Sequence, residues 1–249
     1  MTLFPTVHES EVPFVTTEQM IEVDRAMIED YGILLIQMME NAGRNLAHLA
    51  RARFLAGDPN GKRVAVLAGV GGNGGGALVC ARRLASWGAD VHVFITRDED
   101  QFKEVPGHQL RILRSMGLPI TRHAKEARSF DLIVDGIIGY SLDGAPHGGS
   151  AELIAWANEQ NGPTLSLDTP SGIDTTTGTV FEPSIRATAT MTLALPKEGL
   201  RSPAVRTQVG ELYLADIGVP PRLYAAPPLE LEVGTIYAQS DIVEVILHL

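Results

Sequence analysis

The chain has almost no cysteine, a shortage of positive charge and no long hydrophobic run. Its 249 residues contain one cysteine, Cys80, which excludes an intramolecular disulfide and a metal site built from several thiolates. The net charge of −10 argues against a nucleic-acid partner, which would require basic patches. No apolar run reaches the roughly 18 residues of a transmembrane helix, and the first residues lack the basic start and apolar centre of a signal peptide. We therefore expect a cytoplasmic protein with no membrane segment.

Short apolar runs that alternate with helical patterns fill most of the chain. The apolar spacing predicts helices over residues 17–28, 34–49, 75–87, 107–116 and 151–160. It predicts strands over residues 64–68, 90–96, 131–138 and 164–168, a short strand near 119–122, and β-rich runs over 188–195 and 210–217. The strands are apolar on both faces, as in a sheet that helices cover on both sides. This alternation predicts an α/β fold, a three-layer α/β/α sandwich with a mostly parallel central sheet.

The chain shows no linker, internal repeat or low-complexity segment that would divide it. We therefore expect a single domain over residues 1–249, with an irregular N-terminal arm over residues 1–15. The stretch after Pro227 is acidic, and its pattern is compatible with a strand and a helix packed on the edge of the sheet.

A glycine-rich loop follows the first strand of this alternation. Residues 64–84 read VAVLAGVGGNGGGALVCARRL, which places six glycines between an apolar strand and an amphipathic helix. Backbone N–H groups at such a helix N-terminus can approach a phosphate, because glycine leaves no Cβ in the way. The loop predicts a ligand of nucleotide size.

Two further strands end in a carboxylate. Asp135 precedes a glycine-containing loop at residues 139–144, and Asp168 opens the sequence DTPSGID. Ligands in such folds bind at the carboxyl ends of the strands, so both loops should lie beside the glycine-rich loop. A carboxylate is costly to bury unless it is paired or coordinated, which favours an active site here. The alternative is that each aspartate caps its loop by accepting bonds from backbone N–H groups.

The same strand ends carry oxygen donors suited to a hard cation. Asn73, Asp135 and Ser171 offer amide, carboxylate and hydroxyl oxygens, which bind such ions. The seven histidines have no paired spacing, which argues against zinc. The alternative is that Asp135 bonds only to N–H groups of the glycine-rich loop.

A dinucleotide-dependent dehydrogenase is a competing interpretation. The sequence GVGGNG at residues 69–74 satisfies G-x-G-x-x-G, and Asp98 follows the next strand, where an acid could bind a ribose. However, two helices precede the first strand, and no set of residues for hydride transfer is evident.

Five segments, in order, resemble the YjeF N-terminal domain family, which is the NAD(P)H-hydrate epimerase family. They are MENAG at residues 39–43, the loop at 69–76, VDGIIG at 134–139, DTPSG at 168–172, and LPKEGL at 195–200 with LYLADIG at 212–218. The chain departs from the family pattern N-N-G-G-D in the loop, where Gly72 and Gly76 replace the first Asn and the Asp.

The resemblance implies a Rossmann-like fold and the interconversion of the R and S forms of hydrated NADH or NADPH, which carry a hydroxyl at C6 of the nicotinamide ring. It implies a potassium ion held by Asn73, Asp135 and Ser171, and one negative charge with oxygen ligands suits potassium better than magnesium. It places the substrate contacts at Gly72, Asn73, Gly74, Gly75, Gly76, Gly139, Tyr140, Ser141, Leu142, Asp143, Gly144, Ala145 and Asp168. Asp168 is our candidate for proton transfer, since it ends a central strand beside the glycine-rich loop.

The resemblance also implies a functional partner, a separate NAD(P)H-hydrate dehydratase. Some relatives of the family use the same fold for interactions alone, so a non-catalytic nucleotide-binding or scaffold protein remains the alternative function. The N-terminal helices are apolar around much of their circumference, including Ile33, Leu34, Leu35, Ile36, Met38 and Met39. A second copy that covers one face would form an isologous homodimer, whereas the alternative is that one subunit encloses these helices.

Overall fold

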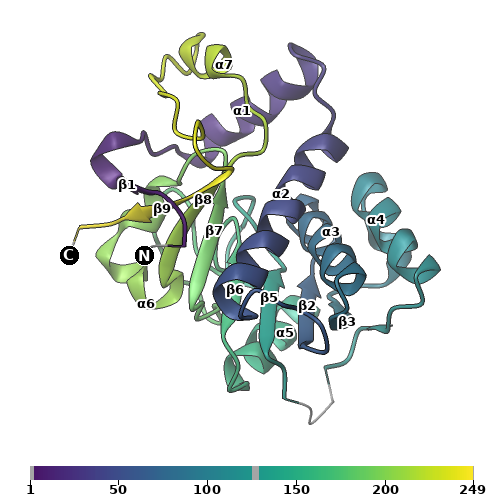
Figure 1. Cartoon of the computed structure of the whole chain (residues 1–249). Helices are drawn as coiled ribbons and strands as arrows, with labels where there is room; N and C mark the ends of the chain where they lie inside the picture. Colours follow the sequence, from purple (N-terminus) through teal and green to yellow (C-terminus); the bar gives the residue numbers. More distant parts are fainter. Residues whose placement is uncertain (1–2, 125–128, 249) are drawn as a thin grey trace.

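A computed structural model describes residues 3–124 and 129–248, which form a nine-stranded sheet in the order β1-β9-β8-β7-β6-β5-β2-β3-β4 (Figure 1). The strands are β1 (Thr6–His8), β2 (Arg63–Ala68), β3 (Asp90–Ile95), β4 (Ile120–Thr121), β5 (Leu132–Gly136), β6 (Thr164–Leu167), β7 (Ala189–Leu193), β8 (Glu211–Ala215) and β9 (Ile242–Ile246). Neighbouring strands are parallel except for the antiparallel pair β8 and β9. The predicted α/β fold with a mostly parallel sheet is confirmed.

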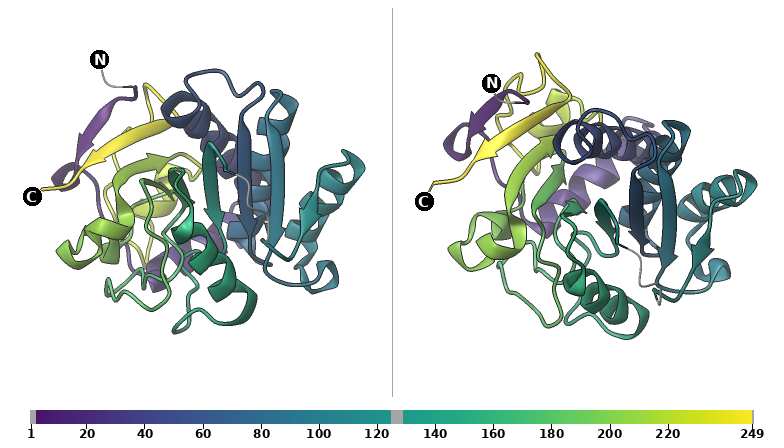
Figure 2. Two further views of the ribbon diagram at one scale, coloured as in Figure 1. Left: turned by 90° about the horizontal axis from the view of Figure 1, so that it is seen from below. Right: turned by 60° about the horizontal axis from the view of Figure 1, so that its bottom comes forward.

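Helices cover both faces of this sheet. They are α1 (Thr17–Glu29), α2 (Leu35–Leu49), α3 (Gly72–Ser86), α4 (Glu104–Ser115), α5 (Gly148–Glu159), α6 (Arg206–Val209) and α7 (Pro221–Ala225). Short helical turns are η1 (Glu9–Glu11), η2 (Ala50–Phe54), η3 (Glu99–Gln101), η4 (Glu198–Arg201) and η5 (Pro203–Val205). Figure 2 shows α5 on the face of the sheet opposite to α2 and α3, which gives three layers.

Strand β2 shows why the sheet is buried on both sides. Val64 and Val66 pack with residues of α2 and α3, whereas Ala65 and Leu67 pack with residues of α5. Successive side chains of a strand point to opposite faces, so a central parallel strand must be apolar at every position. This packing places the carboxyl ends of β2, β5 and β6 at one edge of the core.

Helix α1 extends along this edge. Its N-terminus is a capping box, in which the N–H of Gln19 donates to Oγ1 of Thr16 at 3.2 Å and the N–H of Thr16 donates to Oε1 of Gln19 at 3.0 Å. Met20, Val23 and Met27 are buried against α7 and the end of β7. The cap and this apolar stripe fix which side of α1 faces the cavity described below.

The two ends of the chain differ from expectation. Within the predicted irregular arm, residues 6–8 form β1, which pairs in parallel with β9, so this prediction was wrong for that segment. The pairing joins segments more than 200 residues apart, and no local pattern reveals such a partner. After Pro227 the strand β9 is present, but no helix follows Pro227 within residues 228–248, contrary to the prediction. Met1 and Thr2 of the arm lie outside the described residues.

Across the two described stretches, no helix has both the length and the hydropathy needed to cross a bilayer.

Candidate active site

A cavity of about 830 Å³ opens at the carboxyl ends of the central strands. Its walls are parts of α1 and α2, the glycine-rich loop after β2, the loop after β5, Asp168 after β6, and Lys197 after β7. Segments far apart in the sequence thus meet at the carboxyl ends of the strands, which is where α/β folds of this kind bind their ligands.

The glycine-rich loop forms the N-terminal turn of α3, which begins at Gly72 rather than at Gly75 as predicted. A Cβ on Gly71 or Gly72 would have no neighbour within 4 Å, so the backbone there is open. The first N–H groups of a helix have no acceptor inside the helix, and they provide local positive potential. This turn is a suitable place for phosphate oxygens.

The predicted substrate contacts of this loop divide into two groups. Gly72, Asn73 and Gly76 line the cavity. Gly74 and Gly75 do not, and they serve close packing: a Cβ on Gly74 would lie 1.8 Å from the carbonyl oxygen of Gly69, and one on Gly75 would lie 2.4 Å from Sδ of Met39.

The loop after β5 supplies the largest continuous part of the wall. Each of its seven predicted contacts lines the cavity, namely Gly139, Tyr140, Ser141, Leu142, Asp143, Gly144 and Ala145. Asp98, the ribose-binding candidate of the dehydrogenase interpretation, does not line this cavity and pairs instead with Arg122 at 2.8 Å. The acid on which that interpretation depends therefore points elsewhere.

Asp135, at the end of β5, is fully buried and accepts four hydrogen bonds. The donors are the N–H of Ile137 at 3.1 Å, the N–H of Ser171 at 2.9 Å, Oγ of Ser171 at 2.6 Å and Oγ of Ser166 at 2.8 Å. Burial raises the pKa of the Asp135 carboxyl above its usual range, and these hydrogen bonds oppose that shift. The donors found in the described residues belong to β6 and the loops after β5 and β6, not to the glycine-rich loop.

Asn73 is the third predicted ion ligand, and its side chain lies beside Gly139 in the loop after β5. Its side-chain Nδ2 is buried and has no hydrogen-bond partner among the described residues. Nδ2 is a hydrogen-bond donor, and leaving it buried without a partner costs free energy, so it points to an acceptor atom of a ligand rather than to a cation. The oxygen groups of Asn73, Asp135 and Ser171 are of the type that binds a monovalent cation, but both oxygens of Asp135 already accept hydrogen bonds, and neither Asp135 nor Ser171 lines the cavity.

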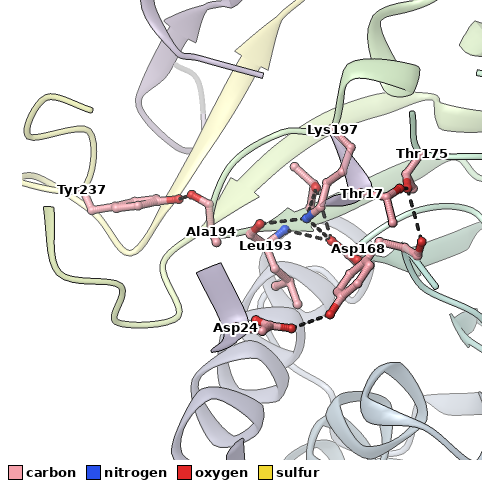
Figure 3. Close-up of polar contacts among 10 residues, drawn as sticks. Thr17, Asp24, Asp168, Thr175, Leu193, Ala194, Lys197 and Tyr237 are labelled. Atoms are coloured by element: carbon pink, nitrogen blue, oxygen red, sulfur yellow. Dashed lines mark hydrogen bonds and ion pairs between the residues drawn. The ribbon is translucent and has the colours of Figure 1, made fainter. Parts of the chain in front are cut away.

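Asp168 and Lys197 form a buried ion pair in the cavity wall (Figure 3). Nζ of Lys197, a fully buried residue, donates to Oδ1 of Asp168, to the carbonyl oxygen of Leu193 at 2.8 Å and to Oγ1 of Thr192 at 3.2 Å. A buried ammonium group requires such partners, since an unpaired charge in the interior is very costly.

The geometry of Asp168 leaves one oxygen for a ligand. Its hydrogen bonds to the described residues fall on Oδ1, whereas Oδ2 lies beside Gly139, where an added Cβ would be 3.3 Å from it and 3.2 Å from Cγ of Asn73. Asp168 also has a φ of +65°, which costs a residue with a side chain about 1–2 kcal/mol. Strain of this kind is concentrated at functional sites.

Sequence reasoning missed several charged residues of the cavity, among them Lys197 and Asp24. Lys197 is the only cation of the mainly apolar stretch LALPKEGL, which was a usable signal. Asp24 interrupts the apolar face of α1, one residue after Val23 and three before Met27. An acid at that position of an amphipathic helix was a second signal.

The fold and the cavity define a class: α/β/α proteins with a ligand site at the carboxyl edge of a parallel sheet, built on a glycine-rich helix N-terminus and buried carboxylates. A family model described as "YjeF-related protein N-terminus" matches residues 35–199. The chain belongs to this family.

Relatives within the family differ in length. An NAD(P)H-hydrate epimerase of Dehalogenimonas lykanthroporepellens is 43% identical over 228 residues, which cover 91% of each chain. A bifunctional NAD(P)H-hydrate repair enzyme Nnr of Salinibacter ruber is 34% identical over 84% of this chain, which spans only 41% of that protein. The crystal structure of yeast ynu0, YNL200c, superposes with a TM-score of 0.79 at 25% identity, covering 94% of this chain and 100% of the other.

Proposed function

We propose that the chain is an NAD(P)H-hydrate epimerase, an isomerase that interconverts the R and S forms of hydrated NADH and NADPH. The observation that carries the proposal is Asp168, whose Oδ1 is fixed by Lys197 while Oδ2 faces the cavity beside Gly139. The relative named NAD(P)H-hydrate epimerase, 43% identical over 91% of both chains, supports it independently.

The nucleotide part of the substrate would lie along the glycine-rich turn. The open backbone at Gly71 and Gly72 and the dipole of α3 suit the diphosphate. Arg97 and Lys103 add positive charge to the same cavity, which compensates locally for the acidic character of the whole chain.

Asp168 would act where the hydroxyl leaves and returns. The C6 carbon is bonded to the ring nitrogen, so the hydroxyl can leave as water once it is protonated, which forms an iminium, and water can return on the other face. Ring opening is the other route to inversion. Either route requires a group that gives and takes a proton at the hydroxyl, and a carboxyl held in place by Lys197 meets this requirement.

Asn73, Asp135 and Ser171 would hold a potassium ion in the same proposal. The ion would supply positive charge at the edge of the sheet, balancing the buried Asp135 and attracting the anionic substrate. Both serine partners of Asp135 are hydroxyls that can reorient toward an ion.

A homodimer in the cytoplasm completes the proposal. The single, buried Cys80 suits a reducing compartment. The functional partner would be an NAD(P)H-hydrate dehydratase, since relatives of this chain are named bifunctional NAD(P)H-hydrate repair enzymes.

The proposal is tested by incubating the purified R-hydrate of NADH with the protein in potassium buffer and following the S-hydrate by chromatography. We expect conversion well above the spontaneous rate, and slower conversion when sodium replaces potassium. Conversion at only the spontaneous rate would reject the epimerase in favour of a binding or scaffold protein.

A further inference from the structure

Asp24 is a second carboxyl group of the cavity, and the function proposed above leaves it unused. It lies on α1 among the buried Val23, Met27 and Met20, and it lines the same cavity as Asp168. No Lys, Arg or His within residues 3–124 and 129–248 forms an ion pair with it. A half-buried acid that lacks an ion-pair partner loses part of its hydration, and its place in the cavity wall indicates a function.

Tyr140 holds this carboxyl group in place. Its Oη donates to Oδ2 of Asp24 at 2.5 Å, which leaves Oδ1 available (Figure 3). The carbonyl oxygen of Tyr140 accepts a hydrogen bond from Oγ1 of Thr175 at 3.4 Å, and that hydroxyl contacts Oγ1 of Thr17 at 2.9 Å. The contacts connect α1 to the loops after β5 and β6, so the two carboxyl groups are held in a fixed arrangement.

Asp24 and Asp168 lie in different surroundings. Burial raises the pKa of Asp24, and the hydrogen bond from Tyr140 and the charge of Lys197 oppose this shift only in part. The groups that face Asp24 are Tyr140, Tyr224 of α7, and the pair of Asp168 and Lys197. Asp168, by contrast, is ion-paired with Lys197. Two carboxyl groups with different environments in one cavity are the usual arrangement of an acid and a base.

We propose that Asp24 is a second proton-transfer group, acting at the C6 hydroxyl in the same cavity as Asp168; this inference rests on the epimerase function proposed above. In one direction the carboxylic acid of Asp24 gives its proton to the C6 hydroxyl. The C6–O bond breaks, its electron pair leaves with the oxygen as water, and the nitrogen lone pair forms the C=N bond of the iminium.

Water then adds on the other face. Asp168 takes the proton of that water as the new C6–O bond forms, and the C=N electrons return to the nitrogen. The roles are exchanged in the reverse direction, and solvent in the open cavity moves the proton from Asp168 back to Asp24. No oxidant or reductant is needed, since every bond broken is matched by one formed.

The first test is Asp24→Asn, which keeps an oxygen that can accept the hydrogen bond of Tyr140 but cannot transfer a proton. We expect kcat to fall on the order of 100-fold in both directions with little change in KM, because a catalyst cannot alter the equilibrium between the epimers. Glu18→Gln, an exposed acid on the same helix, is the matched control and should retain the wild-type rate. A rate for Asp24→Asn within threefold of wild type would overturn the inference.

The second test is the pH profile, which also serves if Asp24→Asn folds poorly. In either direction the reaction begins with one of the two carboxyl groups protonated. The value of kcat/KM should therefore fall when rising pH removes that proton. Tyr140→Phe removes a bond that lowers the pKa of Asp24, so this alkaline fall should move to higher pH. An unchanged profile in Tyr140→Phe would contradict the role of Asp24. A wild-type protein without epimerase activity would instead contradict the proposed function itself.

Discussion

At the scale of single residues, the buried pair of Asp168 and Lys197 is the most informative feature of the site. Neither side chain is tolerable alone in the interior, and the pair orients one carboxylate oxygen toward the cavity. A purely structural ion pair would not require the left-handed φ of +65° at Asp168. The two roles, structural and catalytic, can therefore be separated by paired substitutions.

We expect Asp168→Asn and Lys197→Met each to destabilise the protein by about 3–5 kcal/mol, because each leaves one buried charge without its partner. The double variant should be more stable than either single variant, since it buries no charge. Epimerisation should nevertheless stay at least 100-fold below wild type in the double variant. Urea unfolding and hydrate conversion measure the two properties, and recovery of activity along with stability would show that the pair is only structural.

At the scale of elements, the site depends on the close approach of α2 and α3, which brings the glycine-rich turn to the sheet edge. Gly43 on α2 allows this contact: an added Cβ would lie 2.4 Å from Cβ of Val79 and 2.5 Å from the carbonyl oxygen of Gly76. Backbone and Cβ atoms cannot move aside as a flexible side chain would, so the two helices would have to separate.

Gly43→Ala should therefore lower the free energy of unfolding by about 1–3 kcal/mol, the usual cost of overpacking a core. Gly234→Ala is the control, since its added Cβ has no neighbour within 4 Å, and it should change stability by less than about 0.5 kcal/mol. Equal stability of the two variants in urea would show that the helices are not in close contact.

The helices and strands also show how much of the fold could be predicted from the sequence. The central strands and the longer helices were predictable because a parallel sheet covered on both faces imposes strong local patterns, as in β2. Strand β1 was not predictable from the sequence, because its partner β9 lies at the other end of the chain. The start of α3 was placed three residues late, because glycine is a poor helix former and the first turn here is built from it.

The candidate site was predictable in part for a related reason. Asp168 could be expected at the cavity because strand ends converge in this topology, and it lines the cavity, whereas Asp135 is buried and does not line it. The pairing of Lys197 with Asp168, and of Asp24 with Tyr140, depends on contacts between segments 29 and 116 residues apart. Nothing in the local sequence specifies such contacts.

At the scale of the whole molecule, the apolar surface of the N-terminal helices is only partly covered. Met38 and Met39 are buried, whereas Leu34, Leu35 and Ile21 are 57%, 38% and 53% exposed. Exposed apolar side chains gathered on neighbouring helices are typical of an interface with a second subunit.

We expect a homodimer through this surface, with a mass in light scattering of about twice the 26.8 kDa of the chain at micromolar concentration. Leu35→Glu should shift the equilibrium toward the monomer, since it would bury a charge in the interface. Met116→Glu, an exposed apolar position at the end of α4, should leave the mass unchanged. A wild-type mass near that of one chain would contradict the dimer.

The central claim, that this cavity inverts C6 of hydrated NADH or NADPH, is tested most directly from both sides of the reaction. The protein is added separately to pure R-hydrate and pure S-hydrate in potassium buffer, and both epimers are followed by chromatography over time. The account predicts that the two samples converge rapidly on one common ratio, and that Asp168→Asn slows this convergence on the order of 100-fold. Convergence no faster than in buffer alone, or an unchanged rate in Asp168→Asn, would contradict it.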